Sequence, residues 1–208
     1  MASWANTRNQ LKASLKARSG PEDPDAYTPE RILELLDDEA RLVCLSISEP
    51  AVVKQLAIEL TAATLRQRKQ AFQVEPQILF VFDEAQEFIP ALDKATGIDK
   101  ECSAQVERLL RQGRKYGLGG CVATQRIAHL NTNALQQLHT YFVGLLPRPY
   151  DRNLVSSTFT IDQSILEKTL EFAPGQWLLS SYIATGIENV PIFITADNTE
   201  QELGKAIG

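Results

Sequence analysis

Few residues of this chain are suited to metal binding through nitrogen or sulfur. Its 208 residues include two histidines, His129 and His139, and three cysteines, Cys44, Cys102 and Cys121. With only two histidines, we do not expect a His-based metal site or a Ser-His-Asp triad. An odd number of widely spaced cysteines fits neither a disulfide framework nor a zinc site. We therefore expect free thiols, with Cys44 and Cys121 as small core residues of apolar strands.

Long apolar runs and an excess of positive charge are also lacking. No run approaches the roughly 20 residues that cross a bilayer, and residues 1–20 lack the apolar core of a signal peptide, so we expect a cytoplasmic protein with no membrane partner. The net charge is −5, which excludes a surface that is basic throughout and limits any nucleic-acid contact to a local patch. With 44% apolar and 23% charged residues, the composition is that of a globular protein.

The order of polar and apolar segments predicts one domain with a lead-in. Residues 1–28 are polar, so we expect a flexible N-terminal lead-in there and a single domain over residues 29–208. Strands are expected at residues 41–47, 78–82, 120–124, 141–146, 176–180 and 190–194, and helices at 29–36, 51–69, 101–115, 133–139 and 162–172. This alternation predicts an α/β fold, a three-layer sandwich with a mainly parallel sheet and antiparallel strands near the C-terminus. Core packing is assigned to Phe80, Phe82, Phe142 and Trp177.

The sharpest motif is a pair of acids that directly follows an apolar strand. Asp83 and Glu84 come after the run Ile-Leu-Phe-Val-Phe at residues 78–82. Ligands of open parallel sheets bind at the carboxyl ends of the strands. In phosphoryl transfer the first acid of such a pair holds Mg²⁺, usually through water, and the second orients the attacking water. This is the Walker B pattern, although two acids after a strand can also simply cap a helix or face solvent.

Two further polar groups could serve the same chemistry. Gln125 follows the next apolar strand, and its amide can both donate to and accept from a terminal phosphate or a water. Arg111 and Arg114 lie in a basic cluster at the end of the helix before that strand. Either could be an arginine finger, in the same subunit or from a neighbour in a ring. Alternatively, the cluster is an ordinary set of cations at a helix C-terminus.

These motifs, taken in order, resemble a known group of ATPases. Residues 82–86 (Phe-Asp-Glu-Ala-Gln), 111–117 (Arg-Gln-Gly-Arg-Lys-Tyr-Gly) and 123–126 (Ala-Thr-Gln-Arg) are similar to motifs of the HerA/FtsK group of RecA-like motor ATPases, and most of all to HerA-type DNA translocases. Residues 145–151 resemble the family's next strand and acidic turn. The resemblance covers about residues 40–195, which is most of the chain.

The resemblance implies roles for individual residues. Asp83 would hold Mg²⁺ through water, Glu84 would be the catalytic base and Gln125 the sensor that also contacts nucleotide. Arg111 or Arg114 would be the arginine finger. The family implies an ATP-driven hexameric ring that moves double-stranded DNA, often with a nuclease partner.

One departure from the family limits this chain. A phosphate-binding loop needs the pattern G-x-x-x-x-G-K-[ST] between a strand and a helix, and these 208 residues contain no such pattern. We therefore expect an incomplete RecA-like domain, either the C-terminal part of a longer ATPase or a protein that has lost the loop. Mg²⁺ and ATP would belong to the complete protein, and we expect the isolated chain to bind ATP weakly or not at all and not to hydrolyse it. The alternative is a non-catalytic oligomerisation or DNA-binding module derived from such an ATPase.

Overall fold

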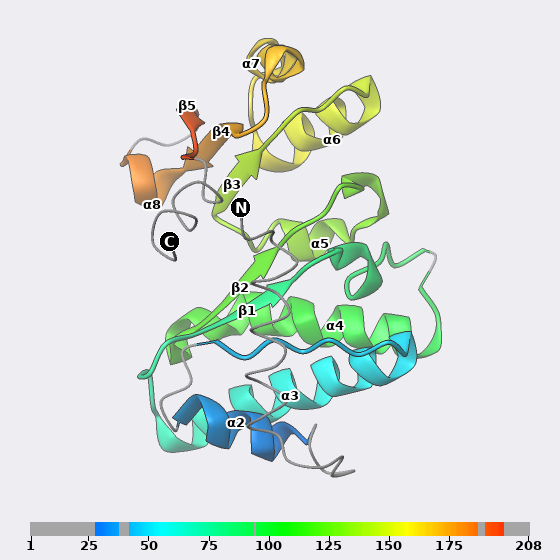
Figure 1. Ribbon diagram of the computed structural model, residues 1–208, viewed down its shortest axis with the longest axis vertical. Coiled ribbons are helices and arrows are strands. Elements are labelled where there is room, and N and C mark those ends of the chain that lie inside the picture. The colour runs from blue at the N-terminus through cyan, green and yellow to red at the C-terminus, as the bar shows by residue number, and fades with distance from the viewer. Residues whose placement is uncertain (1–27, 38–41, 94, 187–189, 198–208) are drawn as a thin grey trace, which may run out of the picture.

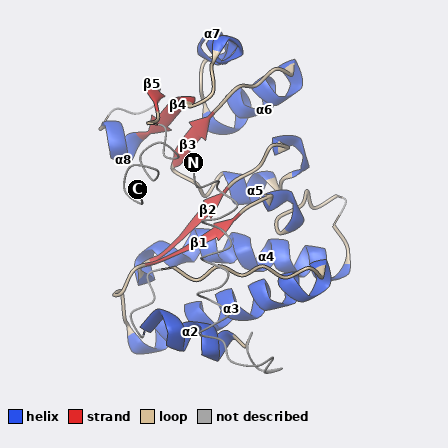
Figure 2. Ribbon diagram, in the orientation of Figure 1, coloured by secondary structure: helices blue, strands red, loops and turns tan. Residues whose placement is uncertain are grey.

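The computed structural model describes residues 28–37, 42–93, 95–186 and 190–197, and it contains both helices and strands (Figures 1 and 2). The helices are α2 (Pro29–Asp37), α3 (Pro50–Ala71), α4 (Gly97–Gln112), α5 (Thr132–Leu135), α6 (Pro149–Phe159), α7 (Gln163–Glu167) and α8 (Tyr182–Thr185). The strands are β1 (Ile78–Phe82), β2 (Leu118–Val122), β3 (Thr140–Val143), β4 (Gln176–Ser181) and β5 (Ile192–Thr195). Short 3₁₀ turns are η1 (Ala85–Glu87), η2 (Gly113–Tyr116), η3 (Ile127–His129) and η4 (Lys168–Glu171). The expected α/β class is confirmed.

Strands β1 and β2 form a parallel pair that packs against α3 and α4. The register runs from Ile78 opposite Leu118 to Phe82 opposite Val122. Phe82 and Leu118 join Val106 and Leu109 of α4 in the larger apolar core. Side chains of a strand alternate between the two faces. Leu79 and Val81 therefore lie on the face away from this core, where each keeps 63% of its surface exposed.

Glycines allow the close turn between α4 and β2. Gly113 ends α4, and a Cβ atom there would lie 2.7 Å from the carbonyl oxygen of Leu118. Gly117 has φ +66°, and a Cβ atom at that position would lie 1.8 Å from the Val74 carbonyl oxygen. Neither position has room for a side chain, and the second also needs the left-handed conformation that glycine adopts at little cost. The turn thus places the last residues of α4 next to the first residues of β2.

Strands β3, β4 and β5 form a separate antiparallel sheet. Thr140 pairs with Ser181 in the first ladder, and Gln176 pairs with Thr195 in the second. This sheet packs on α6 and α7 through a second core that contains Val143, Val155, Ile161, Leu166 and Leu178. The two cores share the partly buried side chains of Ile127 and Phe159. The expected antiparallel strands near the C-terminus are confirmed.

Some local expectations from the sequence are wrong. Residues 42–47 form no strand, because within the described part of the chain they pair with no other strand, although Val43 and Ile47 pack against α2 and α3. Helix α6 occupies residues for which no helix was expected. The lead-in predicted at residues 1–28 lies outside the described residues except for Thr28.

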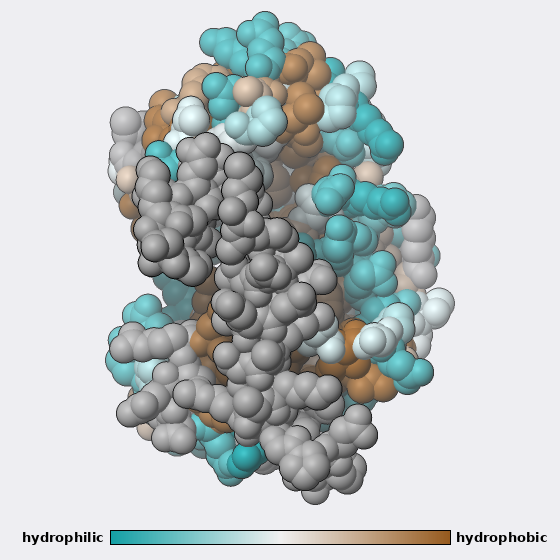
Figure 3. All heavy atoms as spheres, in the orientation of Figure 1, coloured by the Kyte–Doolittle hydropathy of each residue, from teal (hydrophilic) through white to brown (hydrophobic). Residues whose placement is uncertain are grey.

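Four side chains assigned to the core are exposed instead. Cys44 is exposed because its segment joins no sheet, and Cys121 is exposed because it lies opposite Val81 on the open face of β2. Phe142 and Trp177 keep 59% and 38% of their surface exposed, since they share the face of the second sheet that is turned away from its core. In Figure 3 apolar side chains, drawn in brown, reach the surface of the visible face. None of the described helices is both long and apolar enough to cross a membrane.

Candidate functional site

The parallel register brings the predicted acidic pair and the end of β2 to the same edge of the sheet. The amide of Ala123 donates to the carbonyl of Phe82 at 3.0 Å, and the amide of Ala85 donates to the carbonyl of Ala123 at 2.9 Å. Both hydrogen bonds are made by the backbone of Ala123, and Asp83 and Glu84 lie between the two residues that it contacts. Asp83 and Glu84, which follow β1, and Gln125, which follows β2, thus come after the carboxyl ends of two paired strands.

A chain of hydrogen bonds joins the acidic pair to Thr124. Thr124 Oγ1 donates to Gln86 Oε1 at 2.8 Å, and Gln86 Nε2 donates to Glu84 Oε2 at 2.7 Å. Asp83 Oδ1 accepts from the amide of Glu84 at 3.0 Å. Glu84 also has φ +48°, a left-handed conformation that costs a non-glycine residue roughly 1–2 kcal/mol. We call Glu84, Gln86 and Thr124 the amide relay.

The carboxylates fit one part of a Mg-nucleotide site. Asp83, Glu84 and Gln125 are all exposed, so a ligand can reach them. Mg²⁺ keeps most of its water and needs only one or two carboxylates when phosphate oxygens supply the rest. Among the described residues, no group of three or more acidic, histidine or cysteine side chains is arranged so that it could hold a metal ion. The triphosphate itself has no glycine-rich cradle in this sequence.

The predicted arginines lie at the opposite end of the strands. Arg111 is in the last turn of α4, and Arg114 is in η2. The turn that follows contacts the start of β1, where the amide of Ile78 donates to the carbonyl of Gly117 at 2.9 Å. A strand of five residues is about 15 Å long. The structure therefore does not bring Arg111 or Arg114 next to Asp83 within one chain.

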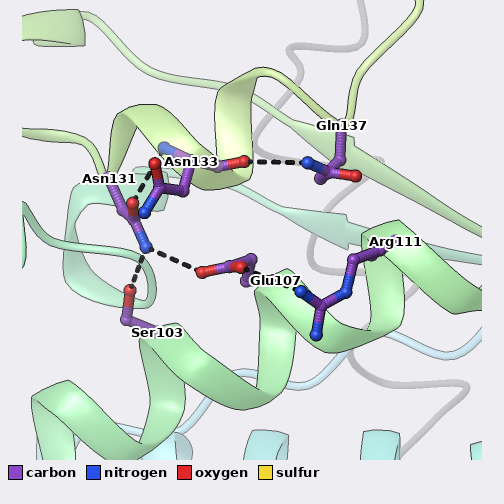
Figure 4. Close-up of polar contacts among 6 residues, drawn as sticks. All are labelled: Ser103, Glu107, Arg111, Asn131, Asn133 and Gln137. Carbon is purple, nitrogen blue, oxygen red and sulfur yellow. Dashed lines mark hydrogen bonds and ion pairs between the residues drawn. The ribbon is translucent and has the colours of Figure 1, made fainter.

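Polar residues that the sequence analysis missed support the loop after the acidic pair. Asn131 is 2% exposed, and its Nδ2 donates to Ser103 Oγ at 3.1 Å and to Glu107 Oε2 at 3.4 Å (Figure 4). Its Oδ1 accepts from the amide of Asn133 at 3.0 Å and caps α5. The amide of Asn131 donates to the carbonyl of Ile89. Asn131 thus links α4, α5 and the segment after Glu84, and no motif in the sequence signals this role.

Lys54 of α3 forms a second support close to the acidic pair. Its Nζ lies 2.7 Å from Asp99 Oδ1 and 3.7 Å from Glu87 Oε2, and its side chain is 11% exposed. Burial alone lowers the pKa of Lys54, but the hydrogen bond and attraction of Asp99, with that of Glu87, outweigh burial and raise it. Burial also raises the pKa of the neighbouring Cys102 thiol to about 11, which excludes this cysteine as a thiolate nucleophile near neutral pH.

Comparison with solved structures identifies the fold. The chain superposes on the genome packaging NTPase B204 of Sulfolobus turreted icosahedral virus 2 bound to sulfate with a TM-score of 0.52 and 16% identity, over 74% of this chain and 66% of that one. The complex of B204 with ATP-γS gives a TM-score of 0.50 and 17% identity, over 69% and 64% of the two chains. The chain therefore shares the fold of this genome packaging NTPase. The chain spans less than two thirds of the ATP-γS-bound relative.

Sequence comparison gives one further similarity. Over 78 residues the chain is 32% identical to the DNA double-strand break repair helicase HerA of Pyrococcus furiosus, which is 38% of this chain and 13% of that protein. No protein-family model matches the chain. The similarity to HerA and the shared fold support an origin among ATPase motors.

Proposed function

We propose that this chain is the C-terminal portion of a HerA/FtsK-like ATPase motor, in which ATP hydrolysis drives DNA translocation or helicase activity in the cytoplasm. The observation that carries the proposal is the meeting of Asp83, Glu84 and the Thr124–Gln125 turn at the carboxyl ends of two parallel strands. The similarity to HerA, a repair helicase, supports DNA as the substrate.

In this proposal each residue has one role. Asp83 holds Mg²⁺ through water in the Walker B position, and Glu84 accepts a proton from the attacking water. Gln125 contacts the terminal phosphate or that water. Mg²⁺, when bound with nucleotide, supplies charge stabilisation to the phosphoryl group. Nothing in the sequence replaces the backbone amides of a phosphate-binding loop, so the isolated chain is inactive.

The position of the arginines favours an assembly. Since Arg111 and Arg114 lie at the far end of the strands, either one would act on the phosphate of a neighbouring subunit. A head-to-tail contact brings unlike ends of two copies together, and repetition of this contact gives a closed ring when the rotation between copies divides a full turn evenly. We therefore propose a homo-oligomeric, hexameric ring for the complete protein, acting on double-stranded DNA and working with a nuclease.

Calorimetric titration with Mg-ATP and a phosphate-release assay test the catalytic part. We expect no turnover and an affinity too weak for a micromolar Kd, because two exposed carboxylates repel an anion that no loop holds. Micromolar affinity, with turnover that Glu84→Gln abolishes, would show that the chain is a complete ATPase.

The second candidate is a non-catalytic module that assembles or binds DNA through the basic cluster near Arg111. Arg108, Arg111, Arg114 and Lys115 are exposed, which favours this candidate. Titration with duplex DNA at two salt concentrations tests it, since phosphate contacts make affinity fall steeply with salt. Light scattering separates DNA binding from ring assembly. Salt-dependent DNA binding by a monomer would favour the module over the motor fragment.

A further inference from the structure

The amide relay has a direction that the chemistry of its three side chains determines. An ionised carboxylate only accepts hydrogen bonds, whereas a glutamine amide donates through nitrogen and accepts through oxygen. Gln86 must therefore present Nε2 to Glu84 and Oε1 to Thr124, as the 2.7 Å and 2.8 Å contacts have it. A reversed amide would place its oxygen against the carboxylate.

Thr124 is held so that its hydroxyl proton points along the relay. The amide of Arg126 donates to Thr124 Oγ1 at 2.9 Å. Because that oxygen already accepts a hydrogen bond, its own proton is available for Gln86. The threonine is thus both an anchor for the glutamine and part of the turn that leads to Gln125.

The backbone around Gln86 is also fixed. Ala85 is fully buried, and its backbone amide donates a hydrogen bond to the carbonyl of Ala123. The amide of Glu87 donates to the carbonyl of Glu84 at 2.9 Å and closes the η1 turn. Gln86 itself is partly buried. The backbone thus fixes the position from which the Gln86 side chain reaches both Glu84 and Thr124.

We propose that Gln86 is a positioning residue that holds one oxygen of Glu84 and ties it to Thr124, so that the acidic side chain and the end of β2 move together. This rests on the role of Glu84 as the base in the proposed function. Among the described residues Gln86 is the only hydrogen-bond donor to this carboxylate. Oε2 of Glu84 is thus held by the amide, and Oε1 is left to accept a proton from water. Residue 86 must be an amide, because alanine has no polar group there and glutamate would repel Glu84.

Side-chain amide NMR of the full 208-residue chain tests the relay without nucleotide. The Gln86 Nε2 signal, assigned by its loss in Gln86→Ala, should show an order parameter near that of rigid backbone, about 0.85. In Thr124→Val, which keeps the shape but loses the hydroxyl, this value should fall below about 0.6. The matched variant Thr124→Ser keeps the hydroxyl and should restore it. A Gln86 order parameter that is as high in Thr124→Val as in the wild type would overturn the proposal. An order parameter as low in Thr124→Ser as in Thr124→Val would also overturn it.

A double-mutant cycle tests whether the relay transmits. The carboxyl ¹³C signal of Glu84 should shift in Thr124→Val when Gln86 is present. The same substitution should leave that signal unchanged in the Gln86→Ala background, because the link is already cut. Equal shifts in both backgrounds would show that Gln86 transmits nothing. Neither measurement depends on nucleotide. The binding experiments therefore test the nucleotide role of this edge, and these two NMR measurements test the relay separately.

Discussion

The two ends of the β1–β2 pair differ in charge and in how firmly their side chains are held. At the carboxyl end the acidic pair is linked by Gln86 to Thr124, and the loop behind it is fixed by Asn131 and Lys54. At the other end Arg111, in the last turn of α4, and Arg114, in η2, are exposed. Hydrogen bonds between side chains thus hold the polar groups at the carboxyl end, which is the end that the proposed function assigns to a Mg-nucleotide. The arginine end is suited to contacts outside the chain.

The largest effect is expected where the support of the acidic end is removed. Asn131→Ala leaves Ser103 and Glu107 without their buried donor and removes the cap of α5. We expect a loss of about 2–3 kcal/mol in the free energy of unfolding, measured by urea denaturation. Gln137→Ala is the matched control, since its 3.3 Å bond is exposed, and it should cost less than about 0.5 kcal/mol. Equal effects of the two substitutions would contradict the account.

The ion pair of Lys54 gives the next effect. Asp99→Asn removes the close charged partner of a largely buried ammonium group, and we expect it to cost about 2 kcal/mol. The more distant and exposed partner is removed by Glu87→Gln, which should cost less than about 0.5 kcal/mol.

The same pair predicts a pH dependence. The pKa of Lys54 is higher in the folded state than in the unfolded state. The stability that Lys54 contributes is therefore fully present below the unfolded-state pKa and is lost as pH rises through the folded-state pKa. The difference in the free energy of unfolding between the wild type and Asp99→Asn should therefore become smaller above about pH 10.5. A constant difference from pH 8 to pH 11.5 would contradict this assignment.

Each end of the pair also contains one left-handed residue that is not glycine. Glu84 lies at the acidic end, and Phe72, which is 86% exposed, ends α3 at the other with φ 49°. At both positions the glycine variant should be about 1 kcal/mol more stable than the alanine variant, because alanine keeps the Cβ atom that is strained there. Thermal unfolding compares each pair of variants. A glycine variant no more stable than its alanine partner would mean that the residue is not left-handed in solution.

The smallest effect is expected at the arginine end. Arg111 Nη1 lies 3.8 Å from Glu107 Oε1, and 55% of the Arg111 side chain is exposed. Such exposed ion pairs contribute little to the free energy of unfolding. Arg111→Ala should therefore change the free energy of unfolding of the isolated chain by less than about 0.5 kcal/mol. A loss above 1 kcal/mol in chemical denaturation would show that Arg111 is structural and weaken its role in contacts between chains.

The sequence predicts the acidic edge well because that edge follows from local pattern. An apolar run at residues 78–82 ends in two acids, and a second strand is expected at residues 120–124 and found at Leu118–Val122, so parallel pairing brings their carboxyl ends together. The strand expected at residues 41–47 is wrong for its described part, residues 42–47, because an apolar pattern alone does not make a strand and this backbone has no pairing partner among the described residues. Exposure of Phe142 and Trp177 likewise depends on which face of their sheet is covered.

The supports of the site could not be predicted because they depend on contacts between distant segments. Asn131 and Ser103 are 28 positions apart, and Thr124 and Gln86 are 38 apart. A lone asparagine or glutamine in a loop has no pattern that indicates such a partner. The position of Arg111 relative to Asp83 is also a matter of topology, since a helix that crosses back over parallel strands ends at their amino ends.

Mapping with Mn²⁺ and ATP-γS tests the central claim most directly. Mn²⁺ replaces Mg²⁺ and broadens the NMR signals of nearby amides, so even weak binding reports its location. We expect selective broadening at Asp83, Glu84, Thr124 and Gln125, none at residues 111–116, and loss of the effect in Asp83→Asn. Broadening centred on another part of the chain, or unchanged in Asp83→Asn, would contradict the assignment of this edge to a nucleotide.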